Sequence, residues 1–179
     1  ETNNINIPPT PQIGAVGVID DYRKVISYNS FHINDEIYLI GAHGTHLSSS
    51  AYERCFFDHK IIKKDSVPPK VNLTSEKNNG NLITKLINKK IISACHDISD
   101  GGLLITLLEM CISRKVTINF SKQFKSHTFL FGEDQSRYII TMDKIKLKEF
   151  EKNIKNTQIQ FTKIGRIMRG NIVKFADNS

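Results

Sequence analysis

The apolar residues of this chain recur at two spacings, one typical of helices and the other of strands. Apolar side chains at positions 82, 83, 86 and 87, and again between 103 and 112, repeat with the period of an α-helix. Thr74 is a plausible N-cap of the first of these helices, with Glu76 in its first turn. Two more helices are predicted, at 49–57 and from about Asp143 onward.

Short runs of β-branched and aromatic residues predict strands between these helices. The runs lie at 13–19, 36–41, 91–95, 116–120, 128–131, 137–142, 159–167 and 171–175. Strands and helices alternate without a uniform β-α-β rhythm, so the order predicts an α/β (α+β) sandwich, in which helices cover a mixed sheet.

The length and the first residues indicate one domain with a short lead-in. The chain has 179 residues, which suits a single domain. Residues 1–11 are polar and contain three prolines, so we expect a linker there and one domain over 12–179. Because the sequence starts without methionine, we expect it to be a processed or excised piece of a longer protein.

The composition narrows the class of protein. With 39% hydrophobic and 24% charged residues, and no apolar run of membrane-spanning length, the sequence predicts a soluble fold without a membrane span. It offers no secretory signal, and three widely spaced cysteines make no disulfide framework, so we expect a cytoplasmic location. The net charge of +7 permits nucleic acid or phosphorylated partners, although an Ile-, Lys- and Asn-rich bias explains part of it.

The segment from Ala94 to Leu103 is the most informative for chemistry. It places Asp97, Asp100 and the pair Gly101–Gly102 between a predicted strand and an amphipathic helix. Free backbone N–H groups and the helix dipole at such a turn attract phosphate, and nearby carboxylates favour phosphate that arrives with Mg²⁺. The simpler alternative is that Asp100 or Ser99 only caps the helix.

A second polar cluster lies between two predicted strands at residues 131–137. Glu133, Gln135 and Ser136 offer acceptors and donors to a bound group, and Arg137 is available for a phosphate or a carboxylate. The alternative is an ordinary solvated hairpin.

Three other constellations fail on geometry or spacing. Cys95 and His96 are strand neighbours that project to opposite faces, so they cannot form a catalytic dyad. Cys55, His59, His43 and His46 lack the spacing of a zinc knuckle. The Gly-x-x-Gly spacing at 41–44 matches an RNA-binding loop only weakly, since it follows a strand.

The motifs resemble a known family. His96-Asp-Ile-Ser-Asp-Gly-Gly-Leu103, Phe131-Gly-Glu-Asp-Gln-Ser-Arg137, Pro9-Thr-Pro-Gln-Ile-Gly-Ala-Val-Gly17 and the stretch from Pro68 to Gly80 are similar, in order and spacing, to the large subunit of phosphoribosylformylglycinamidine synthase. The resemblance covers nearly the whole chain. It is to the last of the subunit's domains, an AIR-synthase-type C-terminal domain.

That resemblance implies a function for the parent protein. The family uses ATP and magnesium to convert formylglycinamide ribonucleotide and glutamine-derived ammonia into the amidine, a ligase step of purine biosynthesis. It implies as partners the N-terminal domains of the same subunit, a glutaminase subunit and a small accessory subunit, with no nucleic acid and no membrane. Its catalytic histidine lies in the N-terminal domains, so we expect no catalytic residue here and no activity of this piece alone.

The resemblance also implies roles for individual residues. Asp97 would face a metal ion, and Gly101, Gly102, Glu133, Gln135 and Ser136 would face nucleotide or substrate, at either the catalytic or the auxiliary site of the family. The resemblance therefore implies ATP or ADP and Mg²⁺ for the whole enzyme and does not require that this piece alone binds either. In two places the sequence departs from its relatives: Ala42 replaces a glutamate, and residues 48–50 replace a glycine-rich turn.

Alternatives remain open at this point. The chain also suits another AIR-synthase relative, such as a selenophosphate synthetase or a thiamine monophosphate kinase, for which the upstream sequence would differ. A basic nucleic-acid-binding module and a purely structural domain are the others.

Overall fold

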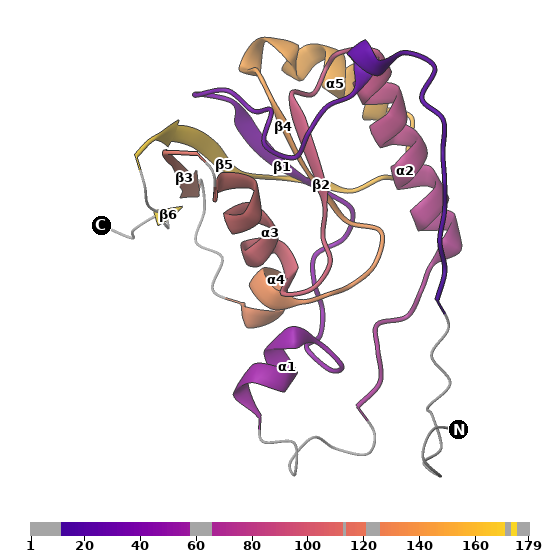
Figure 1. Cartoon of the computed structure of the whole chain (residues 1–179), viewed down its shortest axis with the longest axis vertical. Helices are drawn as coiled ribbons and strands as arrows, with labels where there is room; N and C mark the ends of the chain where they lie inside the picture. The colour runs from indigo at the N-terminus through magenta and orange to yellow at the C-terminus, as the bar shows by residue number, and fades with distance from the viewer. Residues whose placement is uncertain (1–11, 58–65, 113, 121–125, 171–172, 175–179) are drawn as a thin grey trace.

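The fold is a mixed β-sheet covered by helices on both faces (Figure 1). The computed structural model describes residues 12–57, 66–112, 114–120, 126–170 and 173–174. The six strands lie in the order β2-β4-β1-β5-β3-β6, antiparallel throughout except for the parallel pair β3–β6. They are β1 (Glu36–Ile40), β2 (Ala94–Asp97), β3 (Val116–Phe120), β4 (Tyr138–Met142), β5 (Phe161–Arg169) and β6 (Val173–Lys174). The predicted α+β class with a mixed sheet is confirmed.

Two pairs of helices enclose this sheet. Apolar residues of α3 (Gly102–Cys111) and α4 (His127–Phe131) share one core cluster with Ile37 and Leu39. Those of α2 (Leu73–Asn88) and α5 (Leu147–Ile154) share a second cluster with Tyr38 and Ile40. Successive residues of a strand point to opposite faces, so β1 contributes to both clusters and lies at the centre of the domain. The other helices of the described residues are α1 (Ala51–Phe56), η1 (Tyr22–Lys24) and η2 (Lys144–Lys146).

The start of the central strand carries a buried charge. Glu36 is 1% exposed and accepts hydrogen bonds from the Tyr38 hydroxyl (2.9 Å), Lys163 (2.6 Å) and Arg166 (3.3 Å). Burial alone would raise the pKa of the Glu36 carboxyl, but the hydrogen bonds from Lys163 and Tyr38 hold the pKa below its usual value. A buried carboxylate thus ties β1 to its neighbour β5.

Several predicted elements differ in the structure. Residues 128–131, predicted as a strand, lie in α4, where packing of Phe129 and Leu130 into the α3 cluster outweighs the strand preference of the sequence. Helix α2 is capped by Asn72, whose side chain accepts from the Ser75 amide, and Thr74 lies inside the helix. The strand predicted at 91–95 begins at Ala94, after the buried residues Ile91 and Ile92.

The predicted strand at 13–19 is wrong in this structure. The segment is extended but has no strand partner within the described part of the chain, and Ile13 and Val16 are 93% and 101% exposed. A β-strand requires a neighbour to take its backbone hydrogen bonds, which the apolar pattern alone cannot supply. The linker predicted at 1–11 lies outside the described residues.

Among the described residues, no helix is both long enough and apolar enough to cross a membrane.

Candidate functional site

The turn between β2 and α3 is built from glycines in left-handed conformations. Gly101 (φ +82°) is the N-cap of α3 and Gly102 (φ +70°) its first residue. No side chain caps this helix, so the alternative that Asp100 or Ser99 does so is wrong. The turn is anchored by Ile98, which is buried and donates its amide to the Arg137 carbonyl (2.9 Å).

Close packing explains why a glycine stands at position 102. A Cβ atom there would lie 2.6 Å from the carbonyl carbon of Phe131 and 2.7 Å from the carbonyl oxygen of Gly132. The start of α3 therefore presses directly against the end of α4, and the two sequence motifs meet at this point.

Glu133 joins the ends of two helices. Its Oε1 atom accepts the Gly101 amide at 2.8 Å and the Ala51 amide at 2.7 Å. Ala51 is the first residue of α1, so a single carboxylate oxygen ties α1 to the start of α3. Next to it, Asp134 accepts the amide (3.0 Å) and the hydroxyl (2.6 Å) of Thr45, in the loop that follows β1.

Ser136 and Gln135 belong to a different neighbourhood. The Ser136 hydroxyl donates to Glu76 of α2 at 2.6 Å, and the Ser136 carbonyl accepts from the Asn79 amide group at 2.7 Å. Gln135 is exposed. Glu76, which the sequence indicated only as a first-turn residue, is thus an additional site residue. Its contact with Ser136 spans 60 positions of sequence, so no local signal could have found it.

A cleft with two carboxylates collects part of the predicted site. We call it the acidic cleft; it has a volume of about 790 Å³ and lies beside the end of β2. It brings Asp97 together with Gln135 and Ser136, whereas Gly101, Gly102 and Glu133 do not line it. Its polar and charged lining includes Glu76, His96, Asp97, Gln135, Ser136 and Tyr138, together with Ser27, Tyr28 and the buried Arg137.

Asp97 is the most available carboxylate of this cleft. Its side chain is 69% exposed, and its Oδ1 lies 3.3 Å from Nδ1 of His96, whose ring contacts Tyr28. On the neighbouring strand β4, Tyr138 pairs with Asp97, and burial and the nearby Glu76 raise the pKa of its hydroxyl. No group of three or more metal-ligating His, Cys, Asp or Glu side chains occurs within the described ranges. A metal ion at Asp97 would therefore need oxygen ligands from elsewhere.

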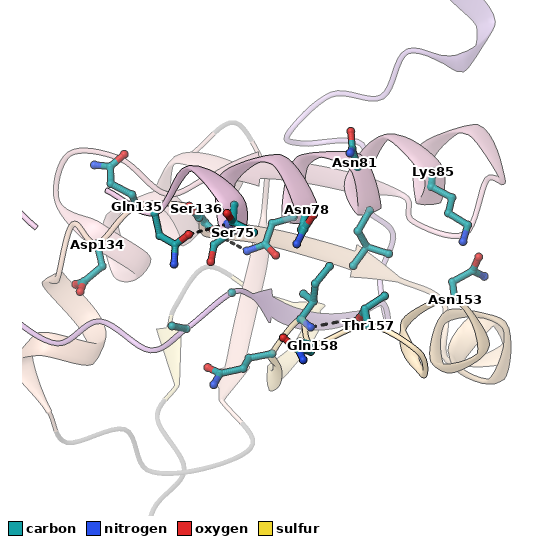
Figure 2. A pocket seen from close by; sticks show the side chains of 18 of the residues that line it. Ser75, Asn78, Asn81, Lys85, Asp134, Gln135, Ser136, Asn153, Thr157 and Gln158 are labelled. Carbon is teal, nitrogen blue, oxygen red and sulfur yellow. Dashed lines mark hydrogen bonds between the residues drawn. The ribbon is translucent and has the colours of Figure 1, made fainter. Parts of the chain in front are cut away.

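A second, larger hollow lies on the other side of residues 134–136. We call it the amide groove; it has a volume of about 950 Å³ and runs between α2 and the segment from α5 to β5. Figure 2 shows Ser75, Asn78 and Asn81 along one wall and Thr157 and Gln158 along the other. Gln135 and Ser136 line both hollows. No motif of the sequence points to this groove by itself, although the cluster of asparagines at 72, 78, 79 and 81 is a signal for it.

Other sequence candidates border the acidic cleft or lie away from it. Arg137 borders the cleft but is 1% exposed, and it donates to the Gly132 carbonyl, so most of its guanidinium lies beneath the surface. Burial lowers the pKa of its guanidinium. Cys95 packs against the core cluster formed by α2 and α5, and burial raises the pKa of its thiol to about 12. His96 instead lies near Glu109 of α3, so the two side chains have different neighbours, as expected if they form no dyad. The zinc candidate His59 lies outside the described residues.

The fold and the site together define a class of protein: an α+β domain whose edge strand ends in an aspartate and a glycine-paired turn beside a polar cleft. Its family model is described as "AIR synthase related protein, C-terminal domain" and matches residues 33–178, so the chain belongs to that family.

Among curated proteins, the chain is similar to phosphoribosylformylglycinamidine synthase subunit PurL. It is 36% identical to the subunit of Pelagibacter ubique over 97% of this chain, and 39% identical to that of Bartonella bacilliformis over 93%. It spans 24% and 22% of their lengths, respectively, or about a quarter of each relative.

Solved structures share the fold. Phosphoribosylformylglycinamidine synthase II of Thermotoga maritima matches 88% of this chain and 26% of its own length with a TM-score of 0.69 at 9% identity. The thiamine-monophosphate kinase of Stenotrophomonas maltophilia matches 85% of this chain and 53% of its own with a TM-score of 0.56 at 18% identity. At these identities the matches show a shared fold only, and the fold does not choose between the two activities.

Proposed function

We propose that this chain is the C-terminal-type domain of a phosphoribosylformylglycinamidine synthase subunit, an ATP-dependent carbon–nitrogen ligase of purine biosynthesis. The sequence similarity to PurL over nearly the whole chain supports this choice over the thiamine-monophosphate kinase. One structural observation carries the proposal: Asp97 and the pair Gln135–Ser136, from two separate motifs, line a single cleft.

The acidic cleft fits a magnesium-bound phosphate group. Magnesium is commonly held by one or two carboxylates together with phosphate oxygens and water. Asp97 supplies an exposed carboxylate at the end of β2, and Glu76 lies in the same cleft, held by Ser136. Asp97 would hold the ion, which would neutralise charge on an adenine nucleotide, while Gln135 and Ser136 would hydrogen-bond the bound group.

Because this domain would hold neither a nucleophile nor a general base for the reaction, its part is to bind and orient. Structures of the Thermotoga maritima relative are described as complexes with ADP, with ATP and with FGAR, which supports nucleotide binding somewhere in that protein. The ligand chemistry required of Asp97 is the same at a catalytic and at an auxiliary nucleotide site.

Partners of the proposed enzyme follow from its chemistry. Another solved structure is described as PurLQS of Thermotoga maritima, an assembly named for more than one subunit. We infer that this domain contacts the N-terminal domains of its own subunit and that the enzyme receives ammonia from a glutaminase with a small accessory subunit. The exposed apolar side chains Ile13, Val16 and Val18 precede the matched family region and suit an interdomain contact.

Reconstitution tests the proposal directly. The full natural protein should convert formylglycinamide ribonucleotide to the amidine with ATP, Mg²⁺ and ammonia, and release ADP and phosphate. Residues 33–178 alone should give no turnover above a heat-killed control. Absence of amidine formation by the full protein, together with phosphorylation of thiamine monophosphate, would reject the proposed activity in favour of the kinase.

A further inference from the structure

Helix α3 starts without any acidic group or side-chain cap of its own. No acidic residue lies in its first turn, and Gly101 at the N-cap has no side chain to accept a hydrogen bond. A ten-residue helix presents a partial positive charge at its start, which a nearby carboxylate stabilises. Glu133 supplies that carboxylate from the loop after α4, at 2.8 Å from the Gly101 amide. We propose that Glu133 is a positioning residue that fixes the Asp97–Gly102 turn and does not itself touch the bound group.

The same oxygen of Glu133 also holds α1. Its contact with the Ala51 amide at 2.7 Å means that loss of one carboxylate releases two helix starts together. Asp134 reinforces the arrangement by accepting two hydrogen bonds from Thr45, six positions ahead of Ala51. The adjacent acids Glu133 and Asp134 thus tie the 45–51 segment to the core of the domain.

This arrangement changes where a phosphate would dock. The Gly101 amide, one of the donors that the sequence offers to an anion, is already taken by Glu133. The start of α3 therefore holds a carboxylate of the protein, and a second anion on the same donor would be repelled. A bound group is left to Asp97, Gln135 and Ser136, which line the acidic cleft. Only this last step rests on the proposed function; the positioning role of Glu133 stands on the contacts alone.

Hydrogen exchange of the full natural protein, measured by mass spectrometry without nucleotide, tests the role. In Glu133→Ala, peptides covering 50–54 and 99–104 should both exchange faster by about tenfold or more, as expected for loss of hydrogen bonds to a charged group. Glu133→Gln keeps an acceptor oxygen and should restore most of the protection in both peptides. Asp100→Asn is the matched control: it removes only an exposed 4.0 Å ion pair to Arg54 of α1, and neither peptide should change.

Kinetics separate positioning from ligand contact. In Glu133→Ala, kcat for amidine formation should fall, while KM for formylglycinamide ribonucleotide stays within about twofold of the natural value. Glu133→Gln, which keeps the acceptor oxygen, should recover most of kcat. Unchanged exchange in both peptides of Glu133→Ala would overturn the inference. So would a loss of protection seen only when nucleotide is added. If Glu133→Ala does not fold, coupled but smaller increases in both peptides of Glu133→Gln are expected, and an increase in neither would reject the role. Because exchange is read without ligand, failure of the proposed activity leaves this result intact.

Discussion

Asp97 begins the turn between β2 and α3, and Glu133 contacts the end of the same turn from the loop after α4. The two carboxylates have different partners. The Asp97 side chain is mostly exposed, lies beside the His96 ring, and lines the acidic cleft. Glu133 is partly buried and accepts two backbone amides from two helices. The two acids come from motifs that look equally functional in the sequence. The Asp97 carboxylate therefore presents its charge outward, whereas the Glu133 carboxylate is used to hold the turn together.

The glycines of the turn belong with Glu133. Gly101 offers its amide to that carboxylate, and Gly102 permits the contact between α3 and the end of α4. Both residues are buried and neither lines the acidic cleft. Their place in the motif is accounted for by the geometry of the chain.

The largest loss of stability is expected at Gly102, where the turn joins α3. Gly102→Ala should destabilise the domain by about 3 kcal/mol, because the new Cβ would collide with the backbone of Phe131 in a left-handed conformation. Native-state hydrogen exchange of the sheet amides measures the free energy. The control Gly17→Ala has no atom within 4 Å of the new Cβ and should change it by less than about 0.5 kcal/mol. Equal effects of the two variants would contradict the claim that close packing at position 102 requires a glycine.

Glu36 gives a reference for a carboxylate that is built into the fold. Glu36→Gln should cost about 2 kcal/mol near neutral pH, since Lys163 and Arg166 lose a buried partner. The pKa of Glu36 is lowered by folding, so its contribution is present above the pKa of the unfolded chain. That contribution is lost as the pH falls through the lower, folded value. Exchange measured between pH 7 and about pH 3 should show the variant and the natural protein converging in acid; a constant gap would contradict this.

A smaller effect is expected at the loop that Asp134 holds. Thr45→Val keeps the shape and removes the hydroxyl that donates to Asp134 at 2.6 Å, at an expected cost of about 1 kcal/mol. Peptides covering 43–47 should exchange faster, while those of β1 stay unchanged. The exposed Thr74→Val is the control and should leave the 43–47 peptides as they are. Faster exchange in the control would show that the measurement does not isolate the Asp134 contact.

Local patterns predicted much of the fold. The helical spacing of apolar residues between 103 and 112 predicted α3, because this spacing is a property of the segment itself. The strands β1, β3 and β4 were also predicted from local patterns, namely runs of β-branched and aromatic residues. The strand predictions for 13–19 and 128–131 were wrong because both depend on neighbours. Residues 13–19 have no strand partner among the residues that the structure describes, and Phe129 packs into the core cluster that contains α3.

The candidate site was predictable only in part. The sequence located the turn at Asp97 and the polar cluster at 133–136, and the structure brings both to one region. It could not divide their acids between ligand and fold. Glu133 meets Ala51 across 82 positions of sequence, and Glu76 meets Ser136 across 60. Such contacts depend on how whole helices and strands pack, and the spacing of residues within a motif does not report this.

The role of Asp97 toward a metal-bound nucleotide can be measured by calorimetry. The full natural protein and its Asp97→Asn variant are each titrated with ADP. Asp97 is exposed, so the substitution should change stability by less than about 0.5 kcal/mol. With Mg²⁺ present, the variant should bind ADP about tenfold more weakly or worse, the scale of loss seen when a metal site is impaired, and with Mg²⁺ chelated the two proteins should bind alike. Equal affinity in the presence of Mg²⁺ would contradict the claim that Asp97 presents its charge to a metal-bound nucleotide.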